Sequence, residues 1–266
     1  MDLPTVEEIL GAAGTHWQPG DAFLAGGSWL FSEPQPGVRR LLDLQSYGWP
    51  SLVHDGSGLE IAATCTLAEL AAWPVPPQWP AAALFGQSCH ALLGSFKIWH
   101  VATVGGNICL ALPAGPMTAV VAALDGVCTL WAADGTATTR PVSEVVVAPG
   151  RTALARGQLL RSVWLPASAL RSRVAFRQAS LSAFGRSAAL VIGRVAPSGG
   201  ETVFTVTAST QRPVQLRYAA SPSPADLARD IDVSVDAWQD DGHGSPAWRQ
   251  ATTHRLLHEV ATELAS

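Results

Sequence analysis

The pattern of apolar residues changes near residue 170, and this change constrains the fold more than any other feature of the sequence. Before it, short apolar runs typical of strands alternate with helical patterns and with breaks rich in glycine and proline. After it come longer stretches, "RVAFRQAS" and "AALVIGRVAPSGGETVFTVTAST", which predict a strand and a hairpin that turns at residues 198–200. Two helical patterns close the chain. The sequence therefore predicts an α+β protein with one domain at residues 1–168 and a second at residues 169–266.

The first domain is expected to consist of two subdomains, at about residues 1–50 and 51–168. Thr5 and Glu8 match a capping box, which predicts a helix of about ten residues near the start of the chain. "DAFLAGGS" and "VRRLLDLQSY" then predict two strands, so residues 1–50 are expected to form a small α/β unit. In the second subdomain, "LVHDGSGLEIAA" predicts a hairpin around Asp55-Gly56. A second capping box, Thr66 with Glu69, predicts a helix start.

Two glycine pairs, in "FLAGGSWLF" and "ATVGGNICLALPAG", each follow what reads as a short apolar strand. Chance alone gives about two such pairs at this glycine content, and the chain has three, so their number carries no weight. Their context is more informative, because Ser28 and Asn107 follow them and can hydrogen-bond. Glycine lets backbone N–H groups approach an anion, so two facing loops would suit a diphosphate, while plain turns are the alternative. Neither pair fits G-x-G-x-x-G, so a Rossmann dinucleotide site is not supported.

Composition and charge exclude several classes of function. The net charge of −4, without a basic stripe, argues against nucleic-acid binding. No run of 18 apolar residues occurs, so no membrane span is expected. The start "MDLPTVEEIL" lacks the basic region of a secretory signal, and a cytoplasmic location is the expectation. Only 14% of the residues are charged and ten are tryptophan, which indicates either a large core or a surface covered by other subunits.

The cysteines and histidines give no sign of a metal site. The four cysteines are widely spaced and form no CxxC motif, so neither a local zinc site nor an iron–sulfur site is expected on this chain. They also give no disulfide framework. His90 and His100 are interpreted as loop or packing residues.

Several stretches, in order along nearly the whole chain, resemble the FAD-binding (medium) subunit of the xanthine dehydrogenase and carbon monoxide dehydrogenase family of molybdenum hydroxylases. They are "FLAGGSWLFSEPQPGVRRLLDL", "SFKIWHVATVGGNICLALPAG", "RTALARGQLLRSVWLP", "RVAFRQAS" and "DGHGSPAWRQATTHRLL". The resemblance implies a two-part FAD-binding domain of the PCMH/vanillyl-alcohol-oxidase-like type. It also implies a C-terminal antiparallel sheet with helices.

The same resemblance implies an electron-transfer role within an oxidoreductase complex. A small partner subunit would carry two [2Fe–2S] clusters, and a large partner would carry the molybdenum–pterin cofactor and oxidise the substrate. The FAD on this chain would pass electrons to an external acceptor, so no catalytic acid or base is expected here. By symmetry preference, a dimer of heterotrimers is the expected assembly. The substrate pocket would lie on another chain, and NAD, oxygen, quinone and ferredoxin are the alternatives for the final acceptor.

Carried over position by position, the resemblance names the cofactor-binding residues. The first loop would comprise Leu24, Ala25, Gly26, Gly27, Ser28 and Trp29, and the second Thr103, Val104, Gly105, Gly106 and Asn107. Leu160 matches an apolar residue beside the flavin rings, and Arg177 matches a lysine near them; an ordinary strand-surface charge is the alternative for Arg177. Some of the residues Lys97, Trp99 and His100, just before the second loop, are expected to line the interface with the iron–sulfur subunit.

The second loop departs from the family pattern. The family often reads "ASPxxD" where this chain reads "ALPAGP", so Leu112 replaces the serine and Pro116 replaces the acid. In the family that acid helps to hold FAD. One alternative is therefore a structural subunit of the same complex that binds flavin weakly or not at all. A self-standing FAD oxidase is a further alternative, although the sequence supplies no acid/base pair for it.

Overall fold

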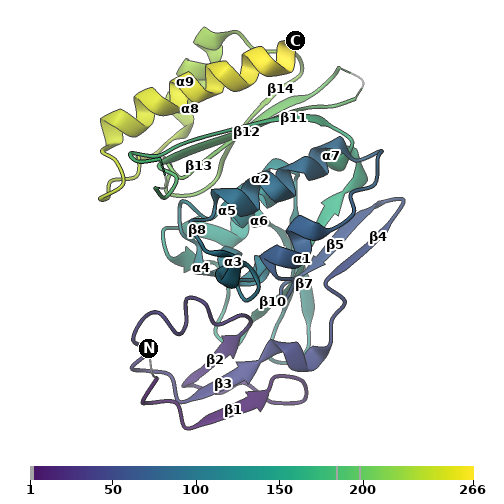
Figure 1. Cartoon of the computed structure of the whole chain (residues 1–266), viewed down its shortest axis with the longest axis vertical. Helices are drawn as coiled ribbons and strands as arrows, with labels where there is room; N and C mark the ends of the chain where they lie inside the picture. Colours follow the sequence, from purple (N-terminus) through teal and green to yellow (C-terminus); the bar gives the residue numbers. More distant parts are fainter. Residues whose placement is uncertain (1–2, 184, 198) are drawn as a thin grey trace.

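The computed structural model describes residues 3–183, 185–197 and 199–266. Figure 1 shows three stacked layers: a small N-terminal sheet, a central body of helices and sheet, and a C-terminal sheet covered by two helices. The predicted α+β fold is confirmed, including the antiparallel sheet with helices that follows residue 170. None of the helices within the described ranges is both long and apolar enough to span a bilayer.

The N-terminal layer is a parallel sheet of three short strands. β3 (Arg40–Asp43) lies between β1 (Glu8–Gly11) and β2 (Asp21–Leu24). A single 3-10 turn, η1 (Leu44–Tyr47), follows β3. Buried Leu42 joins this sheet to Leu159 of the central body. The layer is therefore held by a small apolar core that both subdomains share.

The helix predicted at the start of the chain is wrong, and a strand takes its place. The Thr5 hydroxyl donates to the Gln35 carbonyl oxygen (3.1 Å) instead of capping a helix. The backbone N–H of Glu7 donates to the Arg39 carbonyl oxygen (2.7 Å), and β1 continues this pairing along β3. Parallel pairing with a buried strand overrides the local capping pattern. The expected α/β unit is thus an all-parallel sheet without an α-helix in residues 3–50.

The central body contains a five-stranded antiparallel sheet in the order β4-β5-β10-β6-β7. Its strands are β4 (Leu52–Asp55), β5 (Gly58–Ala62), β10 (Leu159–Pro166), β6 (Val127–Trp131) and β7 (Ala137–Pro141). The predicted hairpin is confirmed: the Asp55 carboxylate accepts the backbone N–H of Ser57 (2.7 Å) at the turn between β4 and β5. β7 is an edge strand with every residue exposed, which fits its polar sequence.

Short helices and a two-stranded ribbon complete the central body. They are α1 (Leu67–Ala72), η2 (Pro80–Ala82), α2 (Ala83–Ala91), α3 (Phe96–Trp99), α4 (Val104–Leu110), α5 (Pro116–Ala123), α6 (Val142–Val145), β8 (Val146–Ala148), β9 (Arg151–Thr152) and α7 (Ala167–Leu170). The second predicted capping box is confirmed, because Thr66 and Glu69 exchange both hydrogen bonds at the start of α1. All residues of α5 are buried, so this helix runs through the core.

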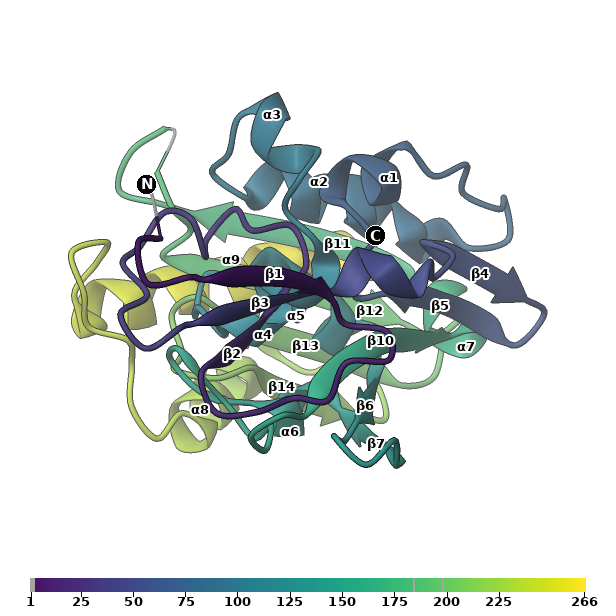
Figure 2. The same cartoon turned by 90° about the horizontal axis from the view of Figure 1, so that it is seen from below.

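The C-terminal layer is an antiparallel sheet, β11 (Arg173–Ala179), β12 (Ala189–Val195), β13 (Thr202–Thr207) and β14 (Val214–Tyr218), in chain order. The helices α8 (Pro224–Ser234) and α9 (Pro246–Ala265) follow it. Figures 1 and 2 show α9 along one face of the sheet, and the central helices lie on the other. The β12–β13 hairpin is confirmed by its pairing, although Ser198 of the predicted turn lies outside the described residues.

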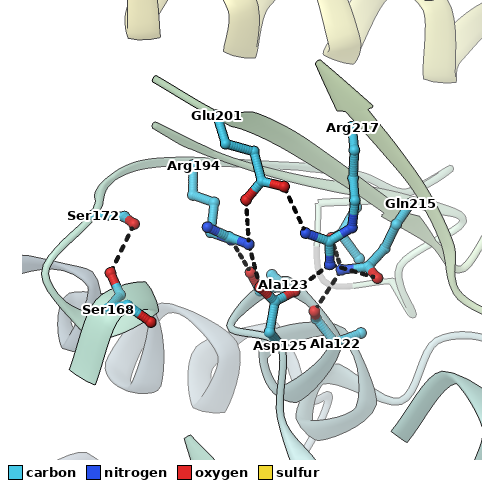
Figure 3. Close-up of polar contacts among 10 residues, drawn as sticks. Ala122, Ala123, Asp125, Ser168, Ser172, Arg194, Glu201, Gln215 and Arg217 are labelled. Atoms are coloured by element: carbon cyan, nitrogen blue, oxygen red, sulfur yellow. Dashed lines mark hydrogen bonds and ion pairs between the residues drawn. The ribbon is translucent and has the colours of Figure 1, made fainter. Parts of the chain in front are cut away.

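A buried arginine joins the C-terminal sheet to the central body (Figure 3). Arg194 on β12 is 4% exposed, and its Nε donates to the Ala123 carbonyl oxygen at the end of α5 (2.9 Å). Its guanidinium also pairs with Asp125 and, at 3.4 Å, with Glu201. A cation at a helix C-terminus complements the partial negative charge of the free carbonyls.

Two further side chains of the sheet extend this contact. Gln215 on β14 donates to the Ala122 carbonyl oxygen (2.7 Å), and Arg217 pairs with Asp125 and with Glu201 (3.1 Å). The last two carbonyls of α5, those of Ala122 and Ala123, therefore accept hydrogen bonds from the other layer. This fixes the helix at one end, while its opposite end borders the cleft described next.

Candidate functional site

A cleft with a volume of about 530 Å³ brings the two glycine pairs together. Here it is called the glycine cleft. Its walls are residues 23–30 and Gln35, residues 91–93 and Ile98, residues 102, 103, 106, 107, 109 and 110, residues 112, 114 and 115, and Arg186. The volume lies in the range of ordinary cofactor and ligand pockets. Residues that are far apart in the sequence therefore line one cleft.

The first glycine pair follows β2, and each glycine there is required by the backbone. A Cβ on Gly26 would lie 1.5 Å from the carbonyl oxygen of Val101, which no side chain can tolerate. Gly27 has φ +69°, a conformation that glycine adopts at little cost. Its carbonyl oxygen accepts the N–H of Phe31 (2.9 Å), which closes the turn. The first loop therefore lies directly against the segment that leads into the second.

The second glycine pair does not follow a strand, contrary to the sequence prediction. It lies in the first turn of α4, with Thr103 as the N-cap, whose hydroxyl accepts the N–H of Gly106 (3.0 Å). Gly105 is buried, and a Cβ there would lie 2.4 Å from the Cβ of Ala63. Gly106 is exposed and lines the cleft. One glycine of this pair therefore serves packing and the other faces the open space.

Asn107 links α4 to the start of α5. Its side-chain oxygen accepts the N–H of Met117 (3.0 Å), which satisfies one of the free donors in the first turn of α5. Pro116, at the position of the family's acid, is buried at the first position of that helix. Leu112, at the position of the family's serine, lines the cleft. The substituted loop is thus well formed, but it offers no carboxylate to the cleft.

The structure brings most of the predicted site residues to one place. The cleft is lined by Leu24, Ala25, Gly26, Gly27, Ser28, Trp29, Thr103, Gly106 and Asn107. Val104 and Gly105 do not line it, because they are buried beneath it against the core. They shape the start of α4 and leave the contact surface to Gly106 and Asn107.

Leu160 and Arg177 are not brought to the cleft. Leu160, on β10, is 3% exposed and packs in the central core. Arg177, on β11, pairs with Glu259 (3.6 Å) and Glu263 (2.6 Å) of α9. Its charge is therefore already compensated by two carboxylates on the side of the sheet that faces α9.

The sequence analysis missed the two ionisable residues among those described that line the cleft. Arg186, between β11 and β12, lines the cleft from the C-terminal layer, and no motif pointed to it. Cys109 of α4 is exposed to the cleft, yet the surrounding protein desolvates its thiol enough to raise the pKa to about 12. This thiol is therefore neutral at physiological pH. Within the described ranges, no group of three or more His, Cys, Asp or Glu side chains is placed to bind a metal ion.

The comparisons with known proteins identify the family. The model for the FAD binding domain in molybdopterin dehydrogenase matches residues 4–168. The chain belongs to this family. No curated protein gives a significant match.

Solved structures of two carbon monoxide dehydrogenases and a quinoline 2-oxidoreductase share the fold of this molybdopterin dehydrogenase domain and of the C-terminal layer. Carbon monoxide dehydrogenase from Oligotropha carboxidovorans has a TM-score of 0.84 at 17% identity, covering 98% of each chain. The carbon monoxide dehydrogenase of Hydrogenophaga pseudoflava gives the same values. Quinoline 2-oxidoreductase from Pseudomonas putida 86 has a TM-score of 0.78 at 16% identity over 100% of both chains.

The residues of the glycine cleft fit the cofactor that the molybdopterin dehydrogenase family implies. Close approach of Gly26 to Val101 leaves the backbone of the first loop bare of side chains at the point where the loops meet. Gly106 adds a second stretch without a side chain at the start of α4, where a ligand can approach the backbone closely, although its own N–H is bonded to the Thr103 hydroxyl (3.0 Å). Apolar walls such as Trp29 and Ile98 suit planar rings. A diphosphate linked to aromatic rings, as in FAD, matches this combination.

Proposed function

We propose that this chain is the FAD-carrying electron-transfer subunit of a heterotrimeric molybdenum hydroxylase. It would receive electrons from [2Fe–2S] clusters on a small partner subunit and pass them to an external acceptor. Substrate oxidation would take place at the molybdenum–pterin cofactor of a large partner. The proposal includes the division into domains at residues 1–168 and 169–266, a dimer of heterotrimers and a cytoplasmic location.

One observation carries the proposal: among the described residues that line the glycine cleft, only Arg186 and Cys109 are ionisable. Neither suits general acid/base catalysis near neutral pH, because arginine stays protonated and the Cys109 pKa is raised to about 12. A self-standing oxidase that takes protons from its own substrate is disfavoured for this reason. Bound FAD would supply the redox chemistry, accepting electrons one at a time and releasing them as pairs.

The chain's own residues would bind and orient the cofactor. The first loop would present backbone N–H groups from residues 25–28, and Gly106 and Asn107 would approach from the N-terminus of α4. Val104 and Gly105 would anchor the first turn of α4 to the core. Trp29, Ile98 and Leu112 would exclude water from the apolar part of the ligand. Leu160 and Arg177 are left out of the proposed binding set because they lie outside the cleft.

The test is flavin content in the assembled complex. The complex is purified with its partner subunits, extracted with acid, and the released FAD is counted against this chain. The expected result is one FAD per chain, which bleaches after the iron–sulfur clusters when substrate is added in rapid mixing. Release of far less than one FAD per chain, with the complex intact, would contradict the proposal.

An exposed apolar surface beside the cleft supports a partner subunit there. Phe96 is 72% exposed and Leu93 is 63% exposed, and the exposed side chains of Ile98 and Val101 lie close to them in the sequence. Lys97 and His100 are exposed in the same segment. Apolar patches with a polar rim are typical of interaction surfaces. We therefore include docking of the iron–sulfur subunit on residues 93–101 in the proposed function.

This docking surface has a matched control on the other layer of the molecule. Phe96→Ser should reduce co-purification of the iron–sulfur subunit and leave FAD content unchanged, because Phe96 does not line the glycine cleft. Val233→Ser on α8, where the native side chain is 81% exposed, should change neither. Equal recovery of the partner from all three proteins would contradict this surface. Trp99, which was expected at the same interface, is only half-buried and packs edge-on against His90.

The replaced residues of the second loop favour one alternative function. With buried Pro116 at the acid position and Leu112 in the wall, the cleft offers fewer polar contacts than the family pattern. The alternative is a structural subunit of the same complex that holds little or no flavin. It predicts an intact complex without stoichiometric FAD, so the flavin count above separates the two functions.

A further inference from the structure

The glycine cleft contains a single side chain with a permanent charge. Arg186 reaches it from the segment between β11 and β12, and the other described lining residues are apolar, glycine or uncharged polar side chains. The Cys109 thiol does not change this balance, because desolvation keeps it protonated. A doubly charged ligand in the cleft would therefore meet one cation of the chain.

The backbone on both sides of Arg186 is fixed by hydrogen bonds. The N–H of Gly185 donates to the carbonyl oxygen of Ser182 (3.0 Å). The hydroxyl of Ser187, itself buried, donates to the side-chain oxygen of Gln178 on β11 (3.0 Å). The Arg186 side chain is exposed, and the ion pairs between described residues do not involve it. Among the described residues, no carboxylate therefore competes with a ligand of the cleft for this charge.

Arg177, the cation suggested by the family resemblance, lies in a different environment. Glu259 and Glu263 both pair with it, so this group of three charges is negative overall. It also lies outside the cleft lining. Within the described chain, the cationic role toward a ligand of the cleft falls to Arg186.

We propose that Arg186 is the counter-charge of the diphosphate group of the cofactor in the glycine cleft. The proposal rests on the proposed function, because it takes FAD as the ligand. The N–H groups at the start of α4 are bonded within the chain, so the glycine loops can offer only uncharged donors of the first loop, and the diphosphate carries fixed negative charge in every redox state. A guanidinium fork can donate two parallel hydrogen bonds to phosphate oxygens and strengthens such contacts. Arg186 would also tie the C-terminal layer to a ligand that is otherwise held by the first 115 residues.

The experiment titrates FAD into the deflavinated complex and follows the quenching of flavin fluorescence. Wild type is measured first, and binding of one FAD per chain supports the proposed function independently of Arg186. Arg186→Gln should then weaken FAD binding by about 10-fold or more, the usual weight of a charge-assisted contact. Arg186→Lys should recover part of the loss, since it keeps the charge without the fork. Arg177→Gln is the matched control and should bind like wild type.

Two further measurements test whether Arg186 contacts the diphosphate or the flavin rings. Salt should weaken FAD binding less in Arg186→Gln than in wild type, because one screened ion pair is gone. The midpoint potential of the bound flavin should stay the same. Unchanged FAD affinity in Arg186→Gln would overturn the inference. A lower midpoint potential in Arg186→Gln at unchanged FAD affinity would also overturn it, because Arg186 would then face the flavin rings. A loss of FAD affinity in Arg177→Gln, with Arg186→Gln unaffected, would overturn it as well.

Discussion

At residues 26–27 glycine is required by a backbone contact and by a positive φ, whereas at residues 105–106 it is favoured by the neighbouring core and cleft. Gly26 meets the Val101 carbonyl and Gly27 has a positive φ. In the second pair both residues have ordinary helical backbone, and Gly105 meets Ala63 of the core while Gly106 faces the cleft. Two identical dipeptides therefore depend on glycine for different reasons, and substitutions can separate them.

Gly26→Ala should have the largest effect. Its Cβ would lie 1.5 Å from the Val101 carbonyl oxygen and 2.6 Å from the carbonyl carbon, so one of the two loops must move. We expect destabilisation of about 4 kcal/mol or more, in the range reserved for severe backbone conflicts, together with loss of FAD. Thermal unfolding and flavin content measure both effects.

A control for Gly26→Ala is available on the segment that follows the first loop. Gly37 has no heavy atom within 4 Å of its ideal Cβ, so Gly37→Ala should leave both stability and flavin content unchanged. If Gly26→Ala unfolds at the wild-type temperature and retains FAD, the contact between the two loops is not as described.

Gly105→Ala should have the next largest effect, through packing alone. The added methyl would meet the Cβ of Ala63 at 2.4 Å and its Cα at 2.7 Å. Overpacking of this kind costs about 1–3 kcal/mol. Urea unfolding should show this loss in the protein without flavin as well as with it. The double variant with Ala63→Gly should recover part of the stability; no recovery would mean that the clash lies elsewhere.

The sequence predicted the pairing of the two glycine loops but not their local structures. Short apolar runs such as "DAFL" mark strands directly, and the resemblance to the flavoprotein family located both loops. The helical start of α4 was missed because two glycines weaken a helix signal, and the Thr103 cap becomes visible only with its Gly106 partner. The N-terminal strand was mistaken for a helix because its partner, β3, is 32 residues away, as the pairing of Glu8 with Arg40 shows.

The charged residues of the site were the part that was hardest to predict from the sequence. The family resemblance suggested Arg177 near the flavin rings, with an ordinary surface charge as the alternative, but the two carboxylates that pair with it come from α9, far along the chain. Arg186 carries no motif, and only the packing of three layers brings it to the cleft. Long-range contacts that depend on tertiary packing leave no local signal in a single sequence.

Gly106→Ala sharpens the comparison because it should separate binding from stability. The new methyl would lie 2.9 Å from the Thr103 hydroxyl, which disturbs a helix cap, while alanine raises helix propensity by about 1 kcal/mol. These effects nearly cancel, so urea unfolding should change little. FAD affinity should fall by about 10-fold, because the methyl faces the cleft. Equal losses of stability in Gly105→Ala and Gly106→Ala would remove the distinction drawn between them.

Acid should weaken the anchor of the first loop and not that of the second. The Asp21 carboxylate at the start of β2 accepts two hydrogen bonds from Arg40, both 2.7 Å, and this pairing lowers the pKa of Asp21 below its usual value. A lowered pKa means that the pair stabilises the fold above the unfolded value of about 3.9 and is lost as the pH falls through the folded value. The second loop is held by Thr103 and Asn107, which do not titrate.

Urea unfolding should therefore show that wild type loses stability below about pH 4 more steeply than Asp21→Asn does. Arg40→Gln should flatten the profile in the same way, since it removes the cause of the shift. This is the smallest expected effect, and parallel profiles for wild type and both variants would show that the first loop is held without this pair.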